Sequence, residues 1–206
     1  MLVKKESTVV SEGNLKIGKT PNVSLLPGAT CAADVPCKSK CYCSRAMRCY
    51  PSAFKKWAAN TRLWQTDPQE FERQILVYLE KKRPEYFRWA VAGDMPDINY
   101  LRMMLRVARR FPDTKFLAFT KQYNLLIEEQ GDRVAWVPPN LTIIVSGWPG
   151  YRTKAFDRLE DIYPTSWVTF KGETSPLYTF PCPGKCEGCR KCWGLKAAEQ
   201  VEFKEH

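Results

Sequence analysis

The chain has 206 residues, is 44% hydrophobic and carries a formal net charge of +10, from 32 Lys and Arg against 22 Asp and Glu. This length supports one substantial core, and no run of about 18 apolar residues predicts a transmembrane helix. The single histidine is His206, at the C-terminal end, so Ser-His-Asp and Cys-His catalysis are excluded unless that tail reaches the site.

The N-terminus, MLVKKESTVV, lacks the apolar run of a signal peptide. We therefore expect a cytoplasmic protein with reduced thiols and no membrane partner. The excess of positive charge favours an anionic partner, either a nucleic acid or a nucleotide, although a solvated basic surface without a partner gives the same composition.

Residues 1–21 predict an irregular arm or a weak hairpin. Residues 13–20 match the phosphate-binding pattern G-x-x-x-x-G-K-T, but Pro21 follows at once and leaves no room for the helix that this motif needs. We therefore expect no ATPase site there. The apolar run from Val23 to Leu26, ended by Pro27 and Gly28, is a candidate first strand.

Two helices are expected next. Aromatic and apolar residues recur at helical spacing over residues 45–64, and Asp67-Pro68 is a typical helix start before a second periodic stretch that ends near Lys82. These aromatic stripes predict core-facing sides rather than a binding surface.

From residue 87 onward, short apolar runs alternate with helical patterns. The expected strands are 87–91, 115–119, 142–145 and 167–170, and the expected helices are 97–111, 122–130 and 154–162. Strand starts recur about every 25–28 residues, which is typical of βα units. The sequence therefore predicts an α/β fold, either a partial (β/α) barrel or an open parallel sheet.

In a parallel sheet the carboxyl ends of the strands meet at one edge, where ligands bind. We expect the loop 31–43 at this edge, together with Gly93-Asp94, Thr120-Lys121 and Ser146. The helix 97–111 carries four arginines on its outer face, which predicts contacts to phosphates. Those arginines are Arg102, Arg106, Arg109 and Arg110.

Four cysteines fall within one short segment, Thr30 to Cys43. They are Cys31, Cys37, Cys41 and Cys43. Thiols this close either bind a metal or form disulfides, and reduced thiols in a cytoplasmic chain favour the metal.

A second cysteine group marks the C-terminal segment, residues 172–206. Its members are Cys182, Cys186, Cys189 and Cys192. The segment is rich in proline and glycine, so we expect no regular element before a short final helix, and we divide the chain into 1–171 and a metal-binding tail, 172–206. The tight cysteine spacing resembles ferredoxin runs and predicts an iron–sulfur cluster, with zinc as the alternative.

A cysteine loop after the first strand, with Gly-Asp after the second, resembles the radical S-adenosylmethionine superfamily. The resemblance implies that three cysteines hold a [4Fe-4S] cluster. They are either Cys37, Cys41 and Cys43 or, as we prefer, Cys31, Cys37 and Cys41, with Tyr42 following the third and Cys43 as a spare thiol or a fourth ligand. It also implies that Gly93 and Asp94 bind the amino group of S-adenosylmethionine. The spacing of the cysteines and an aspartate in place of the usual glutamate depart from the superfamily pattern.

Longer stretches are similar to a phage family, the gene product 88 domain. They are GNLKIGKTPNVSLLPGATC, FRWAVAGDMPDINYL, FPDTKFLAFTK and CEGCRKCW. This resemblance implies a barrel-like fold, cysteine-bound metal and, if the chain is phage-encoded, a place in the cytoplasm of the host cell. It implies no substrate.

Three hypotheses follow. The first is an iron–sulfur enzyme of the radical S-adenosylmethionine type acting on a nucleic acid or nucleotide, with one or two [4Fe-4S] clusters and an electron donor as partner. Thr120, Lys121 and Ser146 are then candidates for the cofactor's carboxylate and ribose. The second is a metal-stabilised nucleic-acid-binding protein without catalysis. The third is an iron–sulfur protein that binds a partner or senses redox state without turnover.

Overall fold

Seven strands form one parallel sheet in the computed structural model, which describes residues 8–131, 136–171 and 179–205. The strands are β1 (Asn22–Val23), β2 (Tyr86–Trp89), β3 (Lys115–Thr120), β4 (Leu141–Ser146), β5 (Thr165–Thr169), β6 (Thr179–Pro181) and β7 (Gln200–Lys204). Their order in the sheet is β1-β2-β3-β4-β5-β7-β6, and every neighbouring pair is parallel. Because the edge strands β1 and β6 do not pair with each other in the described residues, the fold is an open parallel sheet and not a closed barrel.

In the described part of the chain, six α-helices lie between these strands. They are α1 (Tyr42–Cys49), α2 (Pro51–Thr66), α3 (Pro68–Lys82), α4 (Ile98–Arg110), α5 (Tyr123–Gln130) and α6 (Lys154–Asp157). Short 3-10 turns occur at Pro36–Lys38 and Lys191–Gly194. In the described parts of the chain, no helix is both long and apolar enough to cross a membrane.

Local sequence explains several helix boundaries. The side chain of Asp67 accepts a hydrogen bond from Glu70 N and that of Asp97 accepts one from Tyr100 N, so both residues cap their helices. The helix expected over 45–64 is two helices, because Pro51 cannot donate a backbone hydrogen bond and restricts the residue before it. The helix expected over 154–162 ends at Asp157, so that prediction was too long.

The two faces of the sheet have different covers. On one face, helices α2–α6 pack in one large core that includes Phe87, Trp89 and Phe116. On the other face, Leu117 and Ile144 pack in a smaller core with residues of the C-terminal segment. Alternation along the strands produces this division, because successive side chains point to opposite faces.

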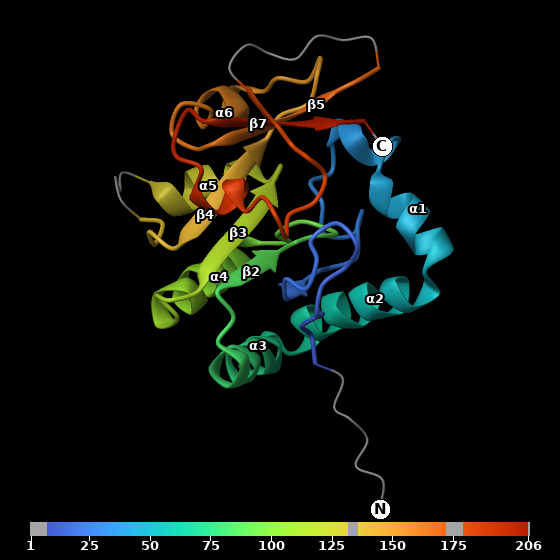
Figure 1. Ribbon diagram of the computed structural model, residues 1–206, viewed down its shortest axis with the longest axis vertical. Coiled ribbons are helices and arrows are strands. Elements are labelled where there is room, and N and C mark those ends of the chain that lie inside the picture. Colours follow the sequence, from blue (N-terminus) through green and yellow to red (C-terminus); the bar gives the residue numbers. More distant parts are fainter. Residues whose placement is uncertain (1–7, 132–135, 172–178, 206) are drawn as a thin grey trace, which may run out of the picture.

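The C-terminal segment is part of the sheet. β7 lies between β5 and β6, and the chain from Cys182 to Glu199 connects β6 to β7 across the face that the helices leave free. Figure 1 shows this segment, in orange and red, passing over the strands. The expectation of an irregular tail with a final helix was therefore wrong, because the segment supplies two strands and its last element is β7.

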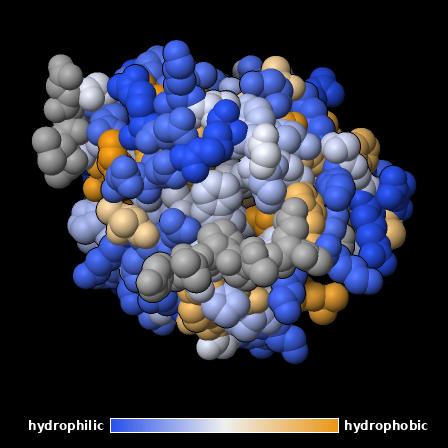
Figure 2. Space-filling view, turned by 90° about the horizontal axis from the view of Figure 1, so that it is seen from above, coloured by the Kyte–Doolittle hydropathy of each residue, from blue (hydrophilic) through white to orange (hydrophobic). Residues whose placement is uncertain are grey.

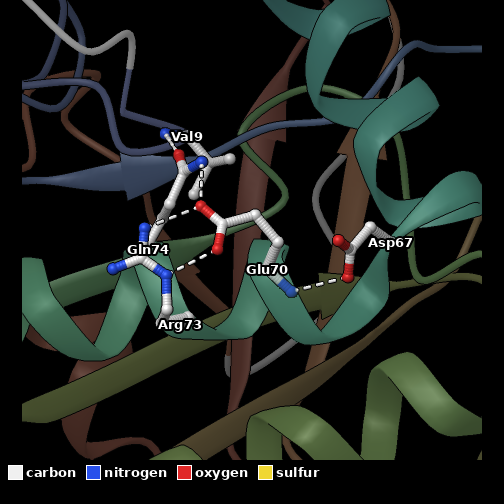
Figure 3. A network of polar contacts seen from close by, with 5 residues as sticks. All are labelled: Val9, Asp67, Glu70, Arg73 and Gln74. Atoms are coloured by element: carbon white, nitrogen blue, oxygen red, sulfur yellow. Dashed lines mark hydrogen bonds and ion pairs between the residues drawn. The ribbon is translucent and has the colours of Figure 1, made fainter.

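The N-terminal arm is fastened to α3. Gln74 accepts a hydrogen bond from Val9 N at 3.0 Å and donates one to Glu70 at 3.0 Å, and Arg73 forms an ion pair with the same carboxylate (Figure 3). Residues 13–20 form a turn with a buried Thr20 and no helix, as expected for a false phosphate-loop match. Figure 2 shows that the end of the molecule at the top of Figure 1 is mostly hydrophilic, with hydrophobic residues in separate small groups.

Candidate metal centres

The N-terminal cysteine group lies in the connection from β1 to α1 and in the first turn of α1. Cys31, Cys37 and Cys41 are half-buried, and Cys43 is buried. The Sγ of Cys31 accepts a hydrogen bond from Gly28 N at 3.5 Å. Because β1 is followed directly by this loop, the group stands at the carboxyl edge of the strands, as the sequence predicts.

Two thiols of this group interact directly. A hydrogen bond from the Cys43 thiol lowers the pKa of Cys41 to about 6, and the same contact with Cys41 raises the pKa of Cys43. Backbone and side-chain donors at Cys43 and Ser44 lower the pKa of Cys41 further. Cys41 is therefore a thiolate near neutral pH, which is the form that binds metals.

The other two thiols share charged neighbours. Burial raises the pKa of Cys31 and of Cys37, and the carboxylate of Asp94 contributes to both shifts. The Lys121 ammonium acts against the shift of Cys37. Cys31 and Cys37 each interact electrostatically with Cys41 as well, so both thiols lie within electrostatic range of a third predicted ligand and of Asp94.

Asp94 is buried, and both of its carboxylate oxygens accept hydrogen bonds. Its Oδ1 accepts hydrogen bonds from Thr120 Oγ1 at 2.7 Å and from Met95 N at 2.8 Å, and its Oδ2 accepts one from Lys121 N at 2.9 Å. Burial raises the pKa of Asp94, and these three donors oppose that shift. Asp94 thus joins the loops after β2 and β3.

The remaining predicted cofactor residues differ in accessibility. Thr120 is buried, and its hydroxyl donates a hydrogen bond to Asp94. Lys121 is half-buried, and its Nζ lies 5.7 Å from the ring centroid of Trp148. Ser146 is buried, and its Oγ accepts a hydrogen bond from Ser166 Oγ at 3.2 Å. Of these side chains only Lys121 is both charged and partly open, so the assignment of the others to a cofactor stays a prediction.

The tail cysteine group lines one small cavity on the free face of the sheet. All four thiols contribute to it, together with Trp193 and Val201. The Sγ of Cys182 accepts a hydrogen bond from Gly184 N at 3.4 Å. Burial, followed by the neighbouring thiol of Cys182, raises the pKa of Cys192 to about 12.

Three cations lie within electrostatic range of the tail thiol of Cys186. Arg88 and Lys16 interact electrostatically with Cys186, and so does Arg190. Arg88 also lies within electrostatic range of Tyr42, beside the N-terminal group, and its buried Nε has no hydrogen-bond partner among the described residues. Nearby cations, one of them with an unused hydrogen-bond donor, suit an anionic metal centre at these thiols.

The donor chemistry fits a soft metal, because thiolates suit zinc and iron–sulfur clusters. All nine cysteines are free, so disulfides do not compete for them. In the arrangement shown, however, no three histidine, cysteine or acidic side chains of the described ranges are grouped so that they could hold a metal ion. Binding would require the thiols of each group to turn toward a common point.

The sequence reasoning missed several residues of these sites. Thr30 accepts a hydrogen bond from Asp94 N at 3.1 Å, and its carbonyl accepts one from Gln122 Nε2 at 3.2 Å. Arg88 alternates with Phe87 and Trp89 along β2, so strand periodicity could have assigned it to the face opposite the helices. No comparable pattern identifies Thr30 or Gln122.

The basic face of α4 is internally paired. Arg102, Arg106 and Arg110 form ion pairs with carboxylates of α5 and α3 at 2.6–2.7 Å. Arg109 donates a hydrogen bond to the carbonyl of Trp136 at 2.9 Å. The predicted phosphate contacts of this helix therefore have no support, because its guanidinium groups already have partners.

Taken together, these features define an α/β protein with an open parallel sheet and two cysteine groups. Residues 2–195 match the family described as Gene product 88, so the chain belongs to the Gene product 88 family. No curated protein and no solved structure matched the chain. The comparisons give no support to the more distant resemblance to the radical S-adenosylmethionine superfamily.

Proposed function

We propose that this protein is an iron–sulfur enzyme of the radical S-adenosylmethionine type, with the N-terminal cysteines as the ligands of its catalytic cluster. One observation carries the proposal. Cys31 and Cys37 lie within electrostatic range of both Cys41 and Asp94 in the loops that follow the parallel strands, and Lys121 acts on Cys37. The carboxyl edge of the strands is where α/β sheets bind their ligands.

The residues of this edge would have separate tasks. A bound [4Fe-4S] cluster would supply the electron for cleaving S-adenosylmethionine, after taking it from an external donor. Cys41 offers a thiolate at neutral pH. The half-buried ammonium of Lys121 suits the carboxylate of the cofactor, and Asp94 holds the backbone of Lys121 in place. The substrate would be a nucleic acid or nucleotide in the cytoplasm of the host cell.

The tail cysteines would hold a second centre, either a [4Fe-4S] cluster or zinc. Support comes from the cavity that the four cysteines line. It also comes from Lys16, Arg88 and Arg190, which lie within electrostatic range of Cys186. Because Arg88 also reaches the surroundings of Tyr42, one cation lies within range of both cysteine groups. A redox-active tail cluster would thus share its electrostatic surroundings with the catalytic one.

A metal-stabilised nucleic-acid-binding protein without catalysis is the second candidate function. The paired arginines of α4 speak against the surface first expected for it. Unpaired cations on α1 and α2 favour it, and their arrangement is described in the next subsection.

The test is anaerobic reconstitution followed by a search for 5′-deoxyadenosine after addition of S-adenosylmethionine and a reductant. The proposal expects this product from the wild-type chain and none from Cys31→Ala, Cys37→Ala or Cys41→Ala. Cys49→Ala is the matched control, since Cys49 is an exposed thiol of α1 outside the group. A fully loaded cluster without product would contradict the enzymatic proposal.

A further inference from the structure

Positive charge is concentrated in the segment that forms α1 and α2. Residues 35–66 contain seven Lys and Arg and no Asp or Glu. Arg45, Arg48, Lys55 and Arg62 are exposed on the two helices. Figure 1 shows α1 and α2 following each other along one side of the molecule. We call these four cations, with Tyr50 and Phe54, the α1–α2 surface.

The cations of this surface are available. Among the described residues, the side chains of Arg45, Arg48, Lys55 and Arg62 form no ion pair or hydrogen bond. The α4 arginines, by contrast, contact carboxylates or a carbonyl. A segment that carries unpaired cations and no carboxylate is complementary in charge to a chain of phosphates.

Aromatic rings are exposed among these cations. Tyr50, at the junction of the two helices, is 59% exposed, and Phe54, one turn further on, is 43% exposed. Exposed rings beside cations are what single-stranded nucleic acids require, since bases stack on the rings while phosphates contact the charges.

An anionic membrane is the other partner that basic helices attract, but the apolar side of α2 is already occupied. Trp64 is only 7% exposed and packs edge-on against Phe71 and Tyr100 in the main core. A helix that lies in a bilayer interface needs a free apolar face for insertion. The burial of Trp64 therefore favours the nucleic acid.

We propose that the α1–α2 surface binds single-stranded nucleic acid, with phosphates on Arg45, Arg48, Lys55 and Arg62 and bases stacked on Tyr50 and Phe54. α1 begins directly after Cys41, so a nucleic acid bound along α1 would reach the N-terminal cysteine group. The inference does not depend on bound metal. Binding by the fully reconstituted protein without formation of 5′-deoxyadenosine would support it and contradict the enzymatic proposal.

The test measures fluorescence anisotropy of a labelled oligothymidylate of about 15 nucleotides, long enough to cover such a surface. Arg45→Gln/Arg48→Gln is compared with Arg106→Gln/Arg110→Gln, which removes the same charge from α4. We expect the first variant to weaken binding about tenfold and to lower the salt slope by about 1.4, or roughly 0.7 for each lost phosphate contact. The α4 variant should bind like wild type. Metal content is measured for every sample to confirm that it is unchanged.

Two further probes complete the test. Tyr50→Ala should weaken binding of the single strand about tenfold, because stacking on one ring is lost. The duplex with oligoadenylate should bind more weakly than the single strand. Equal losses in the two arginine variants, no effect of Tyr50→Ala, or binding to phosphatidylserine vesicles in place of the oligonucleotide would overturn the proposal.

Discussion

Gly93 allows the loops after β1 and β2 to meet. Its φ is +75°, and a Cβ added to it would lie 2.6 Å from Thr30 Oγ1 and 2.7 Å from the carbonyl oxygen of Leu25. Neither atom can easily move away. The Leu25 oxygen belongs to the backbone, and Thr30 Oγ1 accepts the hydrogen bond from Asp94 N. Any side chain at residue 93 would therefore separate the cysteine loop from Asp94.

We predict that Gly93→Ala lowers the free energy of unfolding by about 3 kcal/mol, because the positive φ and the steric overlap both act. Gly28→Ala is the control. Gly28 has a φ of +81° but nothing within 4 Å of an added Cβ, so its cost should be only about 1 kcal/mol. Urea unfolding of both variants measures the difference, and equal losses would show that the close approach at Gly93 has no importance.

For single residues, the sequence predicted where the side chains lie better than what they contact. It placed Asp94 and Lys121 at the same edge as the cysteines, because parallel strands bring their carboxyl ends together. It did not foresee that Thr120 and two backbone groups occupy the Asp94 oxygens. Such bonds depend on the local path of three loops, which periodicity does not specify.

At the scale of the element, the first turn of α3 carries a pH-dependent contact. Hydrogen bonds from Arg73, and then from Gln74, lower the pKa of Glu70 to about 2 from its ordinary value of 4.5. A lowered folded-state pKa means that ionised Glu70 stabilises the fold above pH 4.5, and that this contribution is lost as the pH falls toward 2.

We predict that the stability difference between wild type and Glu70→Gln is largest above pH 4.5 and vanishes near pH 2. Urea unfolding over this pH range measures it. An NMR titration should also show that Arg73→Gln moves the pKa of Glu70 back toward 4.5. A Glu70 carboxyl that titrates near 4.5 in the wild-type protein would contradict the contact drawn in Figure 3.

The ion pairs of α4 should differ in value according to burial. The side chain of Glu129, the partner of Arg102, is 9% exposed, whereas that of Glu80, the partner of Arg110, is 50% exposed. Arg102→Gln removes an ion pair to a buried carboxylate and should cost about 1–2 kcal/mol, since Arg102 itself is half exposed.

Arg110→Gln is the matched control and should cost less than about 0.5 kcal/mol, as for other exposed pairs. Chemical unfolding of the two variants distinguishes them. If Arg110→Gln cost as much as Arg102→Gln, burial would not set the strength of these pairs.

Elements with strong periodic patterns were the predictable ones. α3, α4, β3 and β4 lie within a few residues of their expected ranges, because apolar spacing and capping residues agree there. β7 was missed, since its neighbourhood, KAAEQVEFKE, is rich in helix-forming residues. Pairing with both β5 and β6 overrides that local preference.

At the scale of the whole molecule, the sheet is covered on one face by helices and on the other by the cysteine-bearing crossover. Trp193 fixes this crossover, because its Nε1 donates a hydrogen bond to the carbonyl of Phe87 at 3.1 Å and its carbonyl accepts one from Thr142 Oγ1 at 3.0 Å. The tail thiols are thereby held against the centre of the sheet. The sequence did not predict this, because composition showed only proline, glycine and cysteine in that segment.

The most direct test of the account is the metal and sulfide content of the chain purified without air. The account predicts about four to eight irons with matching sulfide, or about four irons and one zinc if the tail site holds zinc. Joint replacement of Cys31, Cys37 and Cys41 by alanine should remove one centre, joint replacement of Cys186, Cys189 and Cys192 should remove the other, and Cys49→Ala should remove neither. A chain without bound metal, or metal content that none of these replacements changes, would contradict the account.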